Sequence, residues 1–220
     1  MSEASAEKVN TRVVTAHPSR ERVLDNITLQ LTALKERDVP RRIIDCFKDV
    51  KDDIIRHVCE TRMTENAIPC ILVIPESYLG LDGLLNLLRH GRAKGRTHLE
   101  PRHILNASRN TPQNPYFLIN VTTNLNFLGT NPFTVQRAVN RDNNQRSMLT
   151  FAETCALELH TSLTDTYDIS MIGSRYKEKN NTALLQLHRD KNNQIKLTAS
   201  STLTKDLISP TYKKRQALTV

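Results

Sequence analysis

The chain has 220 residues, of which 38% are hydrophobic and 25% are charged, and its formal net charge at pH 7 is +8. This length allows one sizeable hydrophobic core or two small ones, and the composition argues against wholesale disorder. The longest apolar run covers only 68–74, far short of the ~20 residues that span a bilayer. The first twenty residues lack signal-peptide character. We therefore expect a soluble, cytoplasmic protein with no membrane partner.

The four cysteines are scattered and never form a C-x-x-C spacing. In otherwise apolar stretches such residues behave as small hydrophobic side chains. We expect them to be reduced thiols in the core.

The N-terminal third predicts helices. Residues 1–18 are polar and without periodicity, which predicts a disordered arm. Over 19–37 aliphatic residues recur at three- and four-residue steps, which indicates an amphipathic helix ended by Asp38 and Pro40. The same pattern predicts a second helix over 40–61. The outer face of this region is nearly neutral, with eight Lys or Arg against seven Asp or Glu over 35–62, as is typical of a solvated surface.

The middle of the chain alternates between strands and helices. Continuous aliphatic residues over 68–74 predict a buried strand that Pro75 ends, and 114–122 predicts a second central strand. Between them, the stretch 81–91 predicts a short helix, with Gly91 as the residue after its end.

Two further helix starts carry capping signals. Asn131 can cap a helix in which Pro132 takes the first position. Thr150 and Glu153 have the spacing of a capping box, which predicts that another helix begins there.

The final third has the period of β-strands, predicted at 169–172, 183–187 and 195–199, with 189–193 as a hairpin connection. We therefore predict an α+β fold, with N-terminal amphipathic helices packed on a mixed β-sheet whose C-terminal part is an antiparallel meander. The predicted domain covers 19–205. Residues 206–220 contain few apolar side chains and predict a flexible tail.

Several short motifs occur in an order that is similar to an uncharacterised bacterial protein family, a domain of unknown function, over about residues 23–200. The motifs are YFLINV at 116–121, Leu128-Gly129 before Asn131-Pro132, Ser147-x-Leu149-Thr150-x-x-Glu153, Met171-Ile172-Gly173-Ser174-Arg175, Ala183-Leu184-Leu185, and LLRHGRAKG at 87–95.

The resemblance implies an intracellular bacterial protein but brings no reaction, cofactor or catalytic residue. The chain departs from the family near its C-terminal end, where the family commonly has a segment rich in Trp, Cys and Gly. That difference makes any function of the segment in relatives uncertain for this chain.

The stretch 88–103 is the most basic part of the chain, and Glu100 is its one carboxylate. Arginine matches phosphate oxygens in two-point geometry, and glycine lets the backbone approach a ligand closely. The stretch therefore predicts a contact to nucleic acid or a phosphorylated molecule, although a solvated helix end is the ordinary alternative. The predicted ligand-binding cations are Arg89, Arg92, Lys94, Arg96 and Arg102.

Gly173, Ser174 and Arg175 form the other candidate site. Successive backbone N–H groups in such a turn can bind an anion, with Arg175 as a charge clamp. The alternative is a strand-ending turn in which Gly173 takes a positive φ and Arg175 is exposed or pairs with a carboxylate such as Asp168.

Motifs for metal, cofactor or catalytic chemistry are weak. His90, His98 and His103 lie near Glu100, but no paired cysteines or H-E-x-x-H spacing supports a zinc site. The sequence also contains no P-loop, dinucleotide fingerprint or nucleophile elbow. We therefore predict no metal and no cofactor, and catalytic residues stay unknown.

Three functions follow as hypotheses. The first is a non-enzymatic protein that binds an anionic ligand, either nucleic acid or a phosphorylated molecule, through the basic segment. The second is an enzyme acting on a phosphorylated small molecule, with Ser174 and Arg175 lining its cleft. The third is a protein-interaction module that docks through an exposed strand at 194–200.

Overall fold

The computed structural model describes residues 15–64, 66–89, 93–106, 111–141, 146–178, 181–200 and 204–218. The predicted helix end at Gly91, the cation of Arg92, the imidazole of His90 and most of the predicted arm, residues 1–14, lie outside the described residues.

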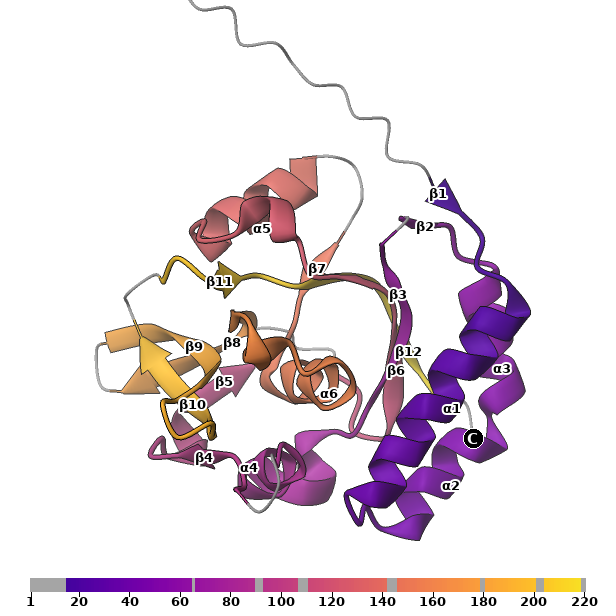
Figure 1. Ribbon diagram of the computed structural model, residues 1–220, viewed down its shortest axis with the longest axis horizontal. Helices are drawn as coiled ribbons and strands as arrows, with labels where there is room; N and C mark the ends of the chain where they lie inside the picture. Colours follow the sequence, from indigo (N-terminus) through magenta and orange to yellow (C-terminus); the bar gives the residue numbers. More distant parts are fainter. Residues whose placement is uncertain are drawn as a thin grey trace, which may run out of the picture.

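Helices occur mainly in the first three quarters of the chain (Figure 1). The α-helices are α1 (Arg20–Glu36), α2 (Arg41–Asp49), α3 (Lys51–Cys59), α4 (Glu76–Leu87), α5 (Pro132–Arg141) and α6 (Phe151–Thr161). Short 3₁₀ turns are η1 (Pro101–His103), η2 (Leu125–Phe127) and η3 (Leu163–Asp165).

One sheet, called here the antiparallel sheet, has the strand order β3-β6-β12-β7 with every neighbouring pair antiparallel. Its strands are β3 (Ile68–Val73), β6 (Tyr116–Thr122), β7 (Ser147–Met148) and β12 (Thr211–Ala217). A separate short ladder joins β1 (Thr15–Ala16) to β2 (Met63–Thr64). β6 is buried along almost its whole length, because helices cover both faces of this sheet.

The second sheet, called here the meander sheet, has the order β11-β8-β9-β10-β4, and β5 also pairs with β8. Its strands are β4 (Arg96–Thr97), β5 (Ile104–Asn106), β8 (Asp168–Glu178), β9 (Asn181–Arg189), β10 (Ile195–Ser200) and β11 (Leu207–Ile208). The connection β8–β9–β10 is an antiparallel meander, whereas β4 and β11 are parallel to their neighbours, so the sheet is mixed. The α+β fold and the C-terminal meander are confirmed.

The elements form layers around α6 (Figure 1). Helices α1, α2 and α3 lie on one side of the antiparallel sheet, and α6 and α4 lie on the other side. The meander sheet lies beyond α6. Because α6 is enclosed between two sheets, every residue from Phe151 to Glu158 is buried.

Two carboxylates on this buried helix lie beside arginines from different sheets. Glu153 is fully buried, and its Oε1 lies 2.6 Å from a terminal guanidinium nitrogen of Arg215 on β12. Glu158 accepts hydrogen bonds from the backbone and hydroxyl of Thr164 and lies 3.6 Å from Arg189 of β9, which pairs more closely with Asp165 at 2.6 Å. A buried carboxylate without such partners would cost several kcal/mol, so these contacts set how both sheets pack on α6.

The predicted flexible tail over 206–220 is wrong for most of its length. Residues 211–217 form β12, between β6 and β7 in the antiparallel sheet, and Thr211 and Tyr212 are buried. The composition conceals this strand because its buried contacts come from a hydroxyl, a phenol and a guanidinium. Arg215 stacks on the rings of Tyr116 and Tyr212, with its guanidinium carbon 5.8 and 5.2 Å from their centroids.

Two predicted helices differ in detail. The helix over 40–61 is divided into α2 and α3, because Val50 leaves helical geometry at φ −108° and ψ 14°. Gly80 interrupts α4 with a φ of 66°, in the region that favours glycine. In the part of the chain that the structure describes, no helix is long and apolar enough to cross a membrane.

Replacing Arg215 with Met is expected to lower the free energy of unfolding by about 3–5 kcal/mol, because it leaves the buried Glu153 carboxylate without a cation, with hydrogen bonds from Tyr116 and Thr150. Urea unfolding followed by circular dichroism measures the change. Lys213→Met is the matched control, because Lys213 is exposed on the same strand. An Arg215→Met variant no less stable than this control would contradict the assigned contact, and Glu153→Gln in that background should restore part of the loss.

The imidazole of His160 generates a pH dependence of stability. Burial lowers the pKa of His160 from 6.5 to about 3, so the unfolded chain takes up a proton below pH 6.5 while the folded chain stays neutral until about pH 3. This contribution leaves stability unchanged above pH 6.5 and lowers it as the pH falls. The expected loss is about 2 kcal/mol between pH 7.5 and pH 5. His160→Gln should remove this pH dependence from the free energy of unfolding, measured by urea unfolding at pH 7.5 and pH 5. An equal loss of stability between these two pH values in both proteins would refute the assignment.

Candidate anion-binding sites

Arg89 contacts the end of α1, so its guanidinium is used within the helical layer. It follows α4 and donates to the carbonyl oxygen of Glu36 at the C-terminal end of α1, and it pairs with the Asp38 carboxylate at 3.2 Å. Its own carbonyl accepts a hydrogen bond from Arg37. The guanidinium of Arg89 therefore complements the dipole of α1 and ties α4 to α1.

The other described cations of the basic segment are spread over the meander sheet. Lys94 and Arg96 are exposed at the β4 edge. Arg102 lies just before β5, at the opposite side of the sheet, and pairs with Glu100 at 2.7 Å. Because β8, β9 and β10 lie between these two edges, the structure does not bring Arg96 and Arg102 together.

Gly95 also has a structural role. A Cβ atom at this position would lie 2.6 Å from the carbonyl oxygen of Leu85, so glycine allows the segment to pack against α4. The sequence suggested that glycine lets the backbone approach a ligand closely. In the structure, Gly95 lets the backbone approach the helix α4 instead.

Gly173 and Ser174 lie inside β8, so the predicted strand-ending turn is wrong. Gly173 does not have a positive φ. A Cβ there would come within 2.6 Å of the Leu149 carbonyl oxygen, and the Gly173 N–H donates to that oxygen at 3.0 Å. Glycine is needed here because β8 passes against the chain that enters α6, at an irregularity in the β8–β9 register.

Ser174 is fully buried and has partners for its hydroxyl. Its Oγ accepts a hydrogen bond from the N–H of Phe151, the first residue of α6, at 2.8 Å, and it donates to the side-chain oxygen of Asn106. The donor at this helix start is therefore satisfied by protein. This geometry favours a structural role for Ser174 over an anion nest.

Arg175 lies on the same strand and contacts an aromatic ring. Its guanidinium carbon is 5.1 Å from the ring centroid of Phe133 on α5. Four grooves of the described residues are lined neither by Arg175 nor by the segment 93–102. The cleft expected by the enzyme hypothesis is not one of these four grooves.

Of the histidines considered for a metal, His98 and His103 do not assemble with other ligands, and His90 lies outside the described residues. His103 lies 3.3 Å from the Tyr176 hydroxyl and 3.9 Å from Glu100, while His98 is exposed. Within the described ranges, no group of three or more His, Cys, Asp or Glu side chains is arranged to hold a metal ion.

A different set of cations does converge on a groove. The lysine groove, as it is called here, has a volume of about 300 Å³ and lies between α1 and the junction of α2 with α3. It is lined by Thr28, Leu31, Thr32, Lys35, Lys48 and Lys51.

The charges in the lysine groove have one sign. No carboxylate belongs to its lining, and among the described residues Lys35 and Lys51 form no ion pair. Lys48 pairs with Asp45 at 2.9 Å, a hydrogen bond that lowers the pKa of Asp45. Two ammonium groups are therefore available to an anion without breaking an existing pair.

The threonine side chains line the groove, but their hydroxyl groups are not available as hydrogen-bond donors to a ligand. Thr28 donates to the carbonyl of Leu24 at 2.8 Å and Thr32 donates to that of Thr28 at 3.0 Å. Their protons are thus used within α1. Recognition in this groove has to come from the lysine ammonium groups, which act as compact point charges.

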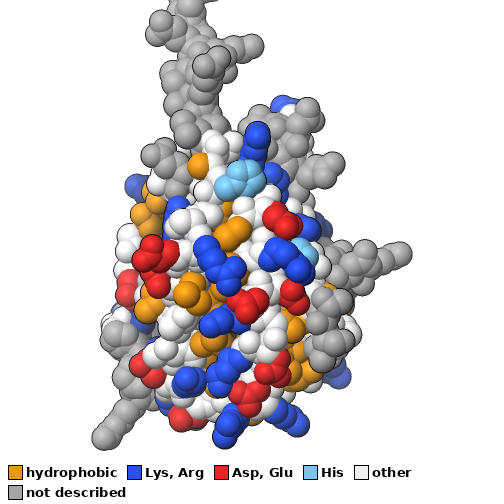
Figure 2. All heavy atoms as spheres, turned by 90° about the vertical axis from the view of Figure 1, so that its right-hand side faces the viewer, with side chains coloured by type: hydrophobic (Ala, Val, Ile, Leu, Met, Phe, Trp, Pro, Cys, Tyr) orange, Lys and Arg blue, Asp and Glu red, His pale blue; other side chains and the backbone are white. Residues whose placement is uncertain are grey.

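The wider helical surface is mixed in charge. Figure 2 shows Lys and Arg side chains interleaved with Asp and Glu, and hydrophobic side chains exposed between them. The lysine groove is therefore a local concentration of positive charge on a face whose charges largely balance. Its field is expected to act at short range.

The chain matches no known protein-family model, no curated protein and no solved structure at a significant level. The resemblance to an uncharacterised bacterial family stays an expectation from the short motifs.

Sequence reasoning placed the lysines on solvated helices but did not bring them together. The recurrence of Thr28, Thr32 and Lys35 at four- and three-residue steps marks one face of α1. That signal alone does not reveal that Lys48 and Lys51 lie opposite, because the break at Val50 and the packing of α1 on α2 and α3 decide it.

Gly173→Ala is expected to destabilise the protein by about 3 kcal/mol, because the added methyl group meets the backbone of Leu149 and neither chain can move freely. Ser174→Ala should cost about 1–3 kcal/mol by leaving the buried Phe151 N–H without an acceptor. Thermal and urea unfolding measure both. If the tripeptide instead bound anions, phosphate would stabilise the wild-type protein and not these variants, which is the opposing outcome.

Proposed function

We propose that this protein binds a phosphorylated small molecule, without chemical conversion, in the lysine groove. The observation that carries the proposal is the convergence of Lys35, Lys48 and Lys51, from three helices, on one groove without a lining carboxylate. Phosphate oxygens carry the negative charge that would compensate these ammonium groups. The volume of about 300 Å³ is at the lower end of the range for small-molecule sites.

A small ligand is favoured over single-stranded nucleic acid. Proteins that bind unpaired strands stack the bases on aromatic side chains along a basic track. The lysine groove has no Phe, Tyr or Trp in its lining. The hypothesis of nucleic-acid binding rests on the basic segment 88–103. The described cations of this segment beyond Arg89 are divided between two edges of the meander sheet.

Binding is favoured over catalysis because the lining offers only lysines, threonines and a leucine. The threonine hydroxyls donate to backbone carbonyls, and no carboxylate or imidazole in the lining can act as their base. The docking hypothesis for 194–200 has little support, since β9 covers one side of β10 and β4 pairs with Lys196 and Leu197 on the other.

The test uses inorganic tripolyphosphate as the probe in isothermal titration calorimetry at low ionic strength. Lys35→Gln combined with Lys51→Gln is expected to weaken binding about tenfold, equivalent to about 1.4 kcal/mol. Added salt should weaken binding to the wild-type protein more than binding to the variant, because screening acts on the charges that were removed.

Lys177→Gln combined with Lys191→Gln is the matched control, because both residues are exposed and lie on the meander sheet or its hairpin. Equal weakening by the two double variants would show non-specific attraction to a basic protein and would overturn the proposal. An absence of tripolyphosphate binding to the wild-type protein would overturn it as well.

A further inference from the structure

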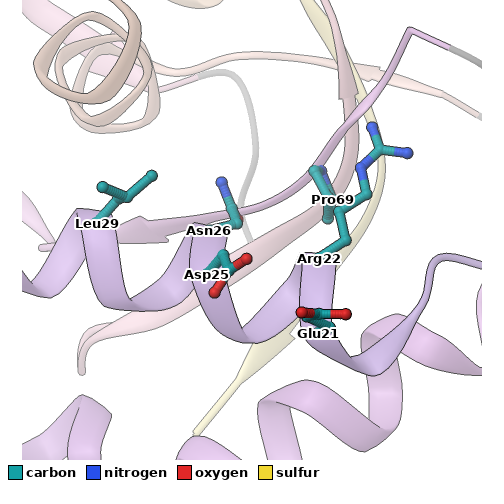
Figure 3. A pocket seen from close by; sticks show the side chains of 6 residues that line it. All are labelled: Glu21, Arg22, Asp25, Asn26, Leu29 and Pro69. Carbon is teal, nitrogen blue, oxygen red and sulfur yellow. The ribbon is translucent and has the colours of Figure 1, made fainter.

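A second groove lies on the other flank of α1, against the edge of the antiparallel sheet. It has a volume of about 430 Å³ and is here called the α1–β3 groove. Figure 3 shows the residues that line it, which are Glu21, Arg22, Asp25, Asn26, Leu29 and Pro69.

The exposed stripe of this groove combines negative charge with an apolar side chain. Glu21, Asp25 and Leu29 follow one another at four-residue steps, so they form a row along α1 about 12 Å long. Leu29 is 71% exposed, the largest fraction among the large hydrophobic side chains that the structure describes. A solvent-exposed leucine between polar groups is a suitable anchor for another apolar side chain.

The two carboxylates have no cation of their own. In the described part of this chain, neither Glu21 nor Asp25 forms an ion pair, although the formal net charge of the protein is +8. Arg22, the one cation of the groove, extends beside Pro69 and donates to the carbonyl oxygen of Ala67 at 3.1 Å. The outer side of the groove is therefore complementary to a positively charged partner.

The neighbouring edge of β3 is already satisfied, which limits how a partner can bind. Gln30 is buried and its amide donates to the carbonyl of Cys70 at 2.8 Å and accepts from the N–H of Leu72 at 2.8 Å. This side chain replaces the peptide group of a further strand. Because the outward-facing Cys70 carbonyl and Leu72 N–H are already used, an added strand would gain few backbone hydrogen bonds here.

We propose that the α1–β3 groove docks a basic amphipathic helix of a partner protein through side-chain contacts. Two Lys or Arg residues one turn apart on that helix pair with Glu21 and Asp25, and an aliphatic residue one turn further packs on Leu29. A helix laid along α1 repeats the four-residue spacing of the row, so all three contacts form together. The proposal is independent of the lysine groove, which lies on the α2–α3 side of α1.

The probe is a fluorescein-labelled helical peptide with an alanine background, carrying Lys at one position, Lys four residues later and Leu four residues after that. Fluorescence anisotropy at low salt is expected to show binding that falls about tenfold for Glu21→Gln combined with Asp25→Gln, a loss of two charge pairs. Leu29→Ala should weaken binding several-fold. A peptide with Glu in place of both Lys residues should not bind.

Asp49→Asn combined with Glu60→Gln is the matched control, since both are exposed acidic residues at the C-terminal ends of α2 and α3 in the same layer. Equal weakening by this control, or equal binding of the acidic peptide, would overturn the proposal. So would a lack of binding by the basic peptide. Sedimentation analysis adds one further outcome: if Leu29→Ala converts a dimer to a monomer, the occupant is a second copy of this chain and the assignment to a partner protein is wrong.

Discussion

The architecture depends on two carboxylates buried in a single central helix. Glu153 and Glu158 lie five residues apart on α6; Glu153 pairs with Arg215 of the antiparallel sheet, and Glu158 accepts hydrogen bonds from Thr164 and lies near Arg189 of the meander sheet. A buried ion pair adds little net stability compared with apolar packing, but a missing partner is very costly. The pairs therefore act mainly on specificity. The observed placement of β12 and β9 leaves each buried carboxylate of α6 with hydrogen-bond donors and an arginine nearby.

This constraint explains why candidate binding surfaces occur on the outer helical layer. The space between the two sheets is filled by α6, and a groove beside this helix is small and lined by aliphatic residues and Cys155. By contrast, α1 lies across the outside, with its buried face on the sheet and its two flanks bordering open grooves. One flank carries lysines and the other carries carboxylates with a leucine. A single helix thus presents two chemically opposite surfaces.

The arginines and glycines that drew attention in the sequence serve mostly to connect elements. Arg89 complements the end of α1, and Arg102 pairs with the nearby Glu100. Gly95 and Gly173 let backbones pass closer than a Cβ atom permits. The N–H donors with which arginine binds phosphate oxygens also bind carbonyl oxygens. The lack of a side chain that lets glycine approach a ligand also lets it approach a neighbouring chain. Local composition cannot distinguish these uses, because the partner of each group comes from a distant part of the chain.

The amino-acid sequence by itself determined the elements whose signals are local. The periodicity of α1, the start of α6 at Thr150, the buried strands β3 and β6 and the hairpin between β9 and β10 all follow from side chains within a few residues of one another. Tertiary structure alone decided the place of β12, because Arg215 and Tyr212 become core residues only when Glu153 and Tyr116 lie beside them. It also decided which charges meet. Helix periodicity assigns a lysine to a face, but whether several faces enclose one groove depends on packing between helices, which no local pattern records.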